Sequence, residues 1–180
     1  AEAEKVDRRV RKTRQRLQAG LLLLMKEKPL SQITMREICR RADVGRSTPY
    51  THYRGVEDIL EQMEAAFYHA LAALLPQYPA SAKAGQAAWL TAVYALAQRN
   101  GLLLEVLLCH NGDPDFLWRL LALCEKGVAA AQAADTPYGD WRVSFLVGGL
   151  TAMVRQWVRG GCTESPEELA RMTLAFVRAD

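Results

Sequence analysis

Residues that favour β-strands are scarce in this chain of 180 residues. It contains 12 Val and 3 Ile against 27 Ala and 25 Leu, so its apolar half consists mainly of strong helix formers. We therefore expect an all-α protein. The length suits one compact domain or two small ones that share a core.

Cysteines are also few, and long apolar runs are missing. The four cysteines are far apart and form no C-x-x-C pair, which argues against a disulfide framework and against a zinc site. The longest apolar stretch, residues 143–154, is shorter than the ~20 residues of a spanning helix. The leucine run at 21–24 is too brief and too late for a signal peptide. We expect a cytoplasmic protein that does not enter a membrane.

Patterns that carry catalysis are missing as well. The sequence has no nucleophile–base pair, no metal-ligand spacing and no Gly-rich phosphate loop. We therefore expect no enzymatic activity, no cofactor and no metal ion.

Charge is distributed unevenly along the chain. Residues 1–55 hold 14 Lys and Arg against 6 Asp and Glu, a net charge of +8, whereas residues 56–180 have a net charge of −5. A basic segment on a mildly acidic body favours a polyanionic partner for the basic segment alone. Part of the first predicted helix, at about residues 5–28, is crowded with Lys and Arg, and phosphate contact and a solvated face are both open readings of it.

The clearest local signal is a capping box, with Thr34 as N-cap and Glu37 at the third helical position. The helix that it starts must end near residues 43–45, where Gly45 is expected to supply the flexibility of the turn. A second short helix is predicted over residues 46–53, rich in polar and basic side chains. Two short helices joined by a tight turn in a basic segment are typical of a helix-turn-helix, in which the first helix braces the second in the major groove.

From residue 56 onward the spacing of apolar residues predicts one helix after another. Asp113 and Pro114 are expected to open one of these helices, residues 136–139 to form a turn, and Ser165 to cap the last helix. The predicted ranges are 56–75, 82–99, 101–109, 113–134, one helix over the stripe from 141 to 157, and a final helix from about 166.

Residues 33–60 carry a family resemblance through the sequence ITMREICRRADVGRSTPYTHYRGVEDIL. In the order of its apolar, turn and aromatic positions it resembles the N-terminal signature of the TetR/AcrR family of bacterial transcriptional regulators. Residues 145–169 resemble, more weakly, the last two helices of many members. The resemblance implies a DNA-binding head of three helices at 1–55, with the helix-turn-helix at about 34–53. It also implies a bundle for ligand binding and dimerisation at 56–180, about nine helices in all.

The resemblance also implies roles for particular residues of the head. At the matching positions, side chains of the bracing helix meet the DNA backbone, and those of the recognition helix face bases or phosphates. Arg54 is expected to replace a phosphate-binding lysine that is common at the position of Val56. The implied DNA-binding residues are Thr34, Arg36, Arg46, Ser47, Thr48, Tyr50, His52 and Arg54.

The body of the family encloses a ligand cavity, and cavities are lined mainly by apolar and aromatic side chains. For any one aromatic residue, plain core packing is the competing interpretation. The expected lining of the pocket, for a small and largely apolar effector, is Phe67, Trp89, Tyr94, Phe116, Leu120 and Met153.

Gly148 and Gly149 form a pair inside a predicted helix. Such a pair is unfavourable by about 1 kcal/mol per residue relative to Ala and usually indicates close helix approach. With the neighbouring aromatic stripe, this pair suits a homodimer in which two helices from each subunit form the interface; packing within one chain is the alternative. The expected dimer residues are Trp141, Phe145, Gly148, Gly149, Trp157 and Phe176.

Together these features predict a ligand-responsive regulator, a repressor released from a pseudo-palindromic operator by its effector. The partners are then double-stranded DNA, a small molecule and a second copy of the chain. The alternative is a TetR-like co-regulator that acts through protein–protein contacts without binding DNA, which Pro49 and Val56 favour.

Overall fold

The computed structural model describes residues 2–79, 83–110, 112, 114–131 and 139–177. Over these residues the chain is helical without a strand, which confirms the all-α prediction. The described residues form eight α-helices and three short 3-10 helices. The α-helices are α1 (Glu2–Met25), α2 (Met35–Ala42), α3 (Val56–Leu74), α4 (Lys83–Arg99), α5 (Gly101–Cys109), α6 (Pro114–Ala131), α7 (Gly139–Arg159) and α8 (Pro166–Val177).

The chain divides into two compact units. Of the described residues, 2–66, 110 and 112 belong to the first unit and the others to the second, so α3 contributes to both. The functional division at residue 55 stays a prediction. The predicted N-cap Asp113 and most of the predicted turn at 136–139 lie outside the described residues.

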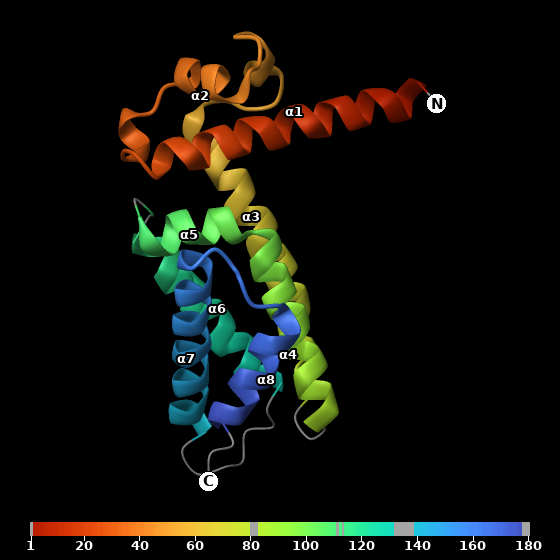
Figure 1. The fold of residues 1–180 in the computed structure, drawn as a ribbon, viewed down its shortest axis with the longest axis vertical. Helices are drawn as coiled ribbons and strands as arrows, with labels where there is room; N and C mark the ends of the chain where they lie inside the picture. The colour runs from red at the N-terminus through yellow and green to blue at the C-terminus, as the bar shows by residue number, and fades with distance from the viewer. Residues whose placement is uncertain (1, 80–82, 111, 113, 132–138, 178–180) are drawn as a thin grey trace. The chain divides into compact units, whose positions relative to one another are not determined.

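In the first unit, α1 and α2 lie side by side (Figure 1). Leu17, Leu21 and Met25 recur every four residues along α1, so they share one face of the helix, and all three are fully buried. Ile38 of α2 and Ile59 of α3 are fully buried as well. These side chains belong to the core of the first unit.

The start of α2 confirms the capping box. The Thr34 hydroxyl oxygen accepts a hydrogen bond from the Glu37 backbone N–H at 3.3 Å, and a Glu37 carboxylate oxygen accepts one from the Thr34 N–H at 3.0 Å. The end of the helix differs from the prediction. Asp43, not Gly45, takes the left-handed conformation, with φ of 52°. Asp tolerates this conformation better than most residues, because its short polar side chain can bond locally.

The second element of the predicted helix-turn-helix is a 3-10 helix, η2 (Thr48–Thr51), and not an α-helix over 46–53. Pro49 contributes to this difference because a proline disfavours helical backbone at the residue before it, here Thr48, whereas its missing N–H costs no hydrogen bond in a first turn. The Thr48 N–H donates to the Gly45 carbonyl and the His52 N–H to the Pro49 carbonyl, both bonds of the 3-10 type. The Pro49 ring is fully buried and anchors this turn.

The second unit is a bundle in which α4 packs against α8, and α7 packs against α5 and α6. Its core contains a buried polar pair, because the hydroxyl oxygens of Tyr94 and Thr173 lie 2.6 Å apart. Thr173 also donates to the Leu169 carbonyl at 2.8 Å, so Tyr94 is the donor of the pair. Burial raises the pKa of Tyr94, which keeps the hydroxyl protonated. The last helix begins with a second capping box, formed by Ser165 and Glu168.

Gly127 marks the closest approach between α6 and the 3-10 helix η3 (Leu75–Gln77). A Cβ atom at this position would lie 2.6 Å from the Leu75 Cβ and 2.7 Å from its Cδ1. Only glycine fits here without a shift of one element. The contact holds Leu75 against the inside of the bundle.

No single helix within the described ranges is long and apolar enough to cross a membrane. Residues 85–99 of α4 and the whole of α5 pass that test together, but the two segments bend by 81° at their junction. Leu103, Leu104, Val106 and Leu107 of α5 are buried in the bundle.

Candidate nucleic-acid interface and ligand cavity

The predicted DNA-binding residues all lie on α2, η2 and the turns beside them. Most of their side chains face solvent, and Thr48 and His52 are half-buried. Tyr50 is the most exposed of the large apolar side chains described in the first unit, with 65% of its surface accessible. These elements of the first unit therefore carry exposed basic, hydroxyl and aromatic groups that can contact a polyanion. The exposed members are Thr34, Arg36, Arg46, Ser47, Tyr50 and Arg54.

Thr34 has a structural task in the protein without DNA. Its hydroxyl donates to the Glu37 carboxylate at 2.8 Å while it accepts from the Glu37 N–H. The Lys28 ammonium donates to the same carboxylate at 2.7 Å. This hydrogen bond from Lys28, followed by those from Thr34, lowers the pKa of Glu37 to about 2. The start of α2 is thus fixed by an ionised carboxylate.

Arg54 is the most exposed charged group at the end of the turn, with 86% of its side chain accessible. Its guanidinium lies 3.3 Å from an Asp58 carboxylate oxygen, and its backbone N–H donates to the other oxygen at 2.8 Å. The backbone bond is the largest cause that lowers the pKa of Asp58. Because an exposed ion pair contributes little, the guanidinium is free to exchange Asp58 for a phosphate.

Tyr53 is a brace that the sequence pattern did not reveal as such. It is 3% exposed, and its hydroxyl accepts from Arg14 at 3.4 Å and from Gln18 at 3.3 Å, both on α1. Arg14 also lies over the Tyr53 ring at 5.6 Å and donates to Gln62 of α3 at 2.7 Å. Arg14 therefore holds the end of η2 between α1 and α3.

The other basic residues in the central part of α1 are exposed, in contrast to Arg14. They form no ion pair with a described carboxylate within 4 Å, so their charge is presented to solvent. Clustered Lys and Arg without acidic neighbours attract phosphate. We name this group the α1 basic strip: Arg8, Arg9, Arg11, Lys12 and Arg16.

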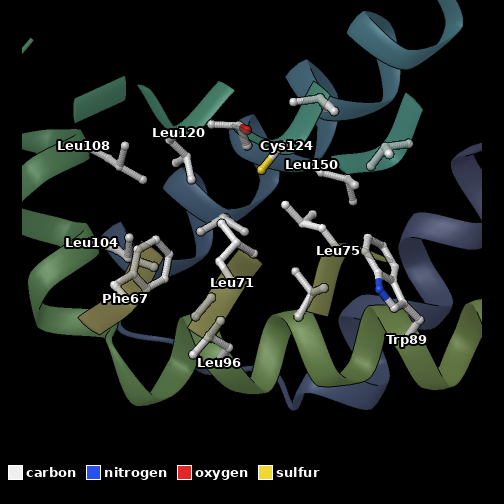
Figure 2. A pocket seen from close by; sticks show the side chains of 16 residues that line it. Phe67, Leu71, Leu75, Trp89, Leu96, Leu104, Leu108, Leu120, Cys124 and Leu150 are labelled. Atoms are coloured by element: carbon white, nitrogen blue, oxygen red, sulfur yellow. The ribbon is translucent and has the colours of Figure 1, made fainter. Parts of the chain in front are cut away.

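The second unit contains an inner cavity of about 70 Å³, which Figure 2 shows from close by. Side chains from α3, η3, α4, α5, α6 and α7 converge on it. Its wall is almost entirely hydrocarbon, and the indole N–H of Trp89 is occupied by the Leu74 carbonyl at 2.8 Å. Burial raises the pKa of the Cys124 thiol in this wall to about 11, so the thiol is neutral near pH 7.

An outer cavity of about 500 Å³ adjoins the inner one, because the two share Trp89, Val128, Val147 and Leu150. Its remaining wall comes from α4, α7, α8 and the end of η3. The volume lies in the range of pockets that hold small molecules.

The predicted pocket residues divide into two groups. Phe67, Trp89 and Leu120 line the inner cavity, and Trp89 and Met153 line the outer one. Tyr94 and Phe116 line neither. Tyr94 is held in the core by Thr173, and Phe116 is fully buried against Phe67 and Tyr68, with ring centroids 6.3 Å and 5.3 Å away.

Five of the predicted dimer residues are exposed positions of α7 and α8, and three of them, Phe145, Gly149 and Phe176, also line the outer cavity. Trp141, Phe145 and Phe176 are 79%, 75% and 66% exposed. A Cβ added at Gly148 or Gly149 would meet nothing within 4 Å, so the glycine pair serves no close helix approach in the described part of its own chain. Trp157 is different: it is 4% exposed and packs edge-on against Tyr94, which takes it out of the predicted interface.

A family model described as the transcriptional regulator C-terminal region of TetR proteins matches residues 89–179, half of the chain. No curated protein matches the sequence. Several solved structures have the same fold. A TetR transcriptional regulator from Streptococcus agalactiae 2603V is 26% identical with a TM-score of 0.55, and the match covers 97% of this chain and 98% of that one.

Two further structures share the fold at lower identity. The dihydroxyacetone kinase operon activator DhaS is 18% identical with a TM-score of 0.56, over 93% of this chain and 94% of its own. The regulator FadR from Bacillus subtilis, solved with stearoyl-CoA, is 15% identical with a TM-score of 0.57, over 92% of this chain and 97% of its own. With the match over residues 89–179 and the fold of these regulators, the chain belongs to the TetR family of transcriptional regulators.

Proposed function

We propose that this regulator is a repressor that binds a pseudo-palindromic DNA operator as a homodimer and is released by a small, largely apolar effector. The observation that carries the proposal is the first unit, where α2 and the η2 turn follow one another in the chain order of a helix-turn-helix and leave Arg36, Arg46 and Tyr50 exposed. The buried Pro49 and Tyr53 fix that turn from beneath.

On DNA, we assign Arg46, Ser47 and Thr48 to bases or phosphates, and Thr34, Arg36, Tyr50, His52 and Arg54 to the backbone. Arg46 reads base edges in this assignment, because bidentate Arg contacts to guanine are the commonest specific contact. The α1 basic strip adds charge without sequence information. Loss of Arg46 should therefore reduce discrimination, whereas loss of an α1 charge should weaken all DNA binding alike.

In the body, the effector occupies the cavities lined by Phe67, Trp89, Leu120 and Met153. It favours a conformer whose two heads are spaced wrongly for the operator, so DNA affinity falls through differential binding to two states. The exposed aromatic residues of α7 and α8, with Gly148 and Gly149, form the dimer interface, since scattered apolar exposure alone would not gather on two helices. We place the protein in the cytoplasm, without enzymatic activity or cofactor.

A second candidate function is a co-regulator that acts through protein contacts without binding DNA. The specific observation in its favour is the short η2, four residues long with a proline, where the sequence pattern predicted a helix over 46–53.

A gel-shift titration of the purified chain on the DNA upstream of its own gene separates the two functions. The repressor binds that fragment more tightly than a scrambled fragment of equal length. Arg46→Ala reduces the difference in affinity between the two fragments, while Arg8→Ala weakens binding to both fragments equally. Absence of binding to both fragments supports the co-regulator instead, and equal affinity for the two contradicts the specific repressor.

A further inference from the structure

The wall of the inner cavity selects for hydrocarbon. None of the described side chains that line it is charged. The Trp89 N–H is already bonded to a backbone carbonyl, and burial keeps the Cys124 thiol neutral. Thr151 also lines the cavity, but almost all of the exposed wall is apolar, so polar ligand atoms find few partners there. A ligand group in this space gains mainly from removal of apolar surface from water.

Among the described residues that line the outer cavity, Arg142 of α7 is the charged one. Phe145, Gly149 and Phe176 line the same cavity, so it opens on the surface that we propose as the dimer interface. No described carboxylate lies within 4 Å of its guanidinium. The Thr173 hydroxyl in the same wall is occupied by Tyr94 and Leu169. Within the described part of the chain, Arg142 is thus a cation without an ion pair in the wall of a largely apolar cavity, and its planar guanidinium matches the geometry of a carboxylate.

Both kinds of wall lie along one helix. Arg142 and Leu146 line the outer cavity, Val147 and Leu150 line both, and Val154 lines the inner one. From Arg142 to Val154 the helix rises by roughly 18 Å. An extended ligand can therefore contact the cation with one end and the hydrocarbon wall with the other.

We infer that the effector is an amphipathic anion, with a carboxylate bound by Arg142 and a hydrocarbon chain that reaches from the outer into the inner cavity. The inference rests on the proposed function and sharpens it, since the sequence indicated only an apolar effector. A neutral apolar effector and this anion differ in one measurable respect, which is the dependence of affinity on Arg142.

The test uses the full chain and two probes of equal chain length, decanoate and decanol, with affinity measured by calorimetry. Arg142→Gln should weaken decanoate by about three- to tenfold, the range for a partly exposed charged hydrogen bond, and leave decanol unchanged. Arg155→Gln is the matched control, because it removes the same charge from α7 at a position that lines neither cavity. Leu120→Phe, which fills the inner cavity, should weaken both probes.

Equal binding of decanoate by the wild type and Arg142→Gln overturns the inference, and so does failure of the wild type to bind decanoate. A gel shift of the same preparations on the upstream DNA tests the proposed repressor function separately from the anionic effector. Operator binding that persists while decanoate fails refutes the anionic effector alone. If the wild-type chain shows no specific binding to the upstream DNA, the proposed function is refuted.

Discussion

The contact between Gly127 and Leu75 gives a sharp prediction about packing in the body. In Gly127→Ala the new Cβ would lie 2.6 Å from the Leu75 Cβ, about 1 Å closer than carbon atoms pack at their optimal separation. The Leu75 Cβ moves only with its backbone, so a change of rotamer does not relieve the clash. Either η3 or α6 must shift.

The magnitude follows from two opposed terms. Overpacking of a core costs about 1–3 kcal/mol, and the upper end applies because backbone must move. Alanine returns about 1 kcal/mol of helix propensity. We expect Gly127→Ala to lower stability by about 2 kcal/mol and Tm by about 4–8 °C.

Thermal unfolding followed by circular dichroism measures this loss. Gly160→Ala is the control, because its Cβ would make only ordinary contacts, at 3.5 Å from the Gln156 and Trp157 carbonyls, and should shift stability by less than about 0.5 kcal/mol. Because Leu75 lines the inner cavity, the Gly127 variant should also bind decanol more weakly. A Gly127→Ala variant as stable as the wild type would refute the packing argument.

Three other changes test separate parts of the molecule. Asp43→Gly should raise stability by about 0.5 kcal/mol in urea unfolding, because glycine adopts φ of 52° without strain; a loss of stability would contradict this. The lowered pKa of Glu37 means that its stabilising contribution is complete above about pH 4.5 and is lost as the pH falls toward 2. Glu37→Gln should therefore lose less stability between pH 5 and pH 3 than the wild type, and an equal loss would argue against this role. Phe145→Asp should give a folded monomer in light scattering, since the side chain is 75% exposed within its own subunit, and an unchanged dimer would place the interface elsewhere.

Features that depend on neighbours in the sequence could be predicted. The two capping boxes join residues three positions apart, Thr34 with Glu37 and Ser165 with Glu168, so the sequence alone contains the whole motif. The all-α class likewise follows from composition and spacing, because Ala and Leu favour helices wherever they stand.

Features that depend on tertiary contacts could not be predicted in this way. The spacing of aromatic residues along α7 could not show which of them are buried. Trp157 packs against Tyr94 of α4, whereas Phe145 of the same stripe is exposed. The sequence does not distinguish Arg14 from the other basic residues of α1. Its structural role follows from its hydrogen bonds to Tyr53 and Gln62, which only the fold brings near it. Side chains that line a cavity differ from core side chains only by the space next to them.

The salt dependence of operator binding tests the central claim most directly. If each dimer neutralises about six phosphates through its heads, the logarithm of the binding constant falls with the logarithm of salt concentration at a slope near −5. The repressor account predicts this slope for the upstream fragment, together with tighter binding than to scrambled DNA at every salt concentration. A binding constant that does not change with salt, or one that is equal for both fragments, would contradict it.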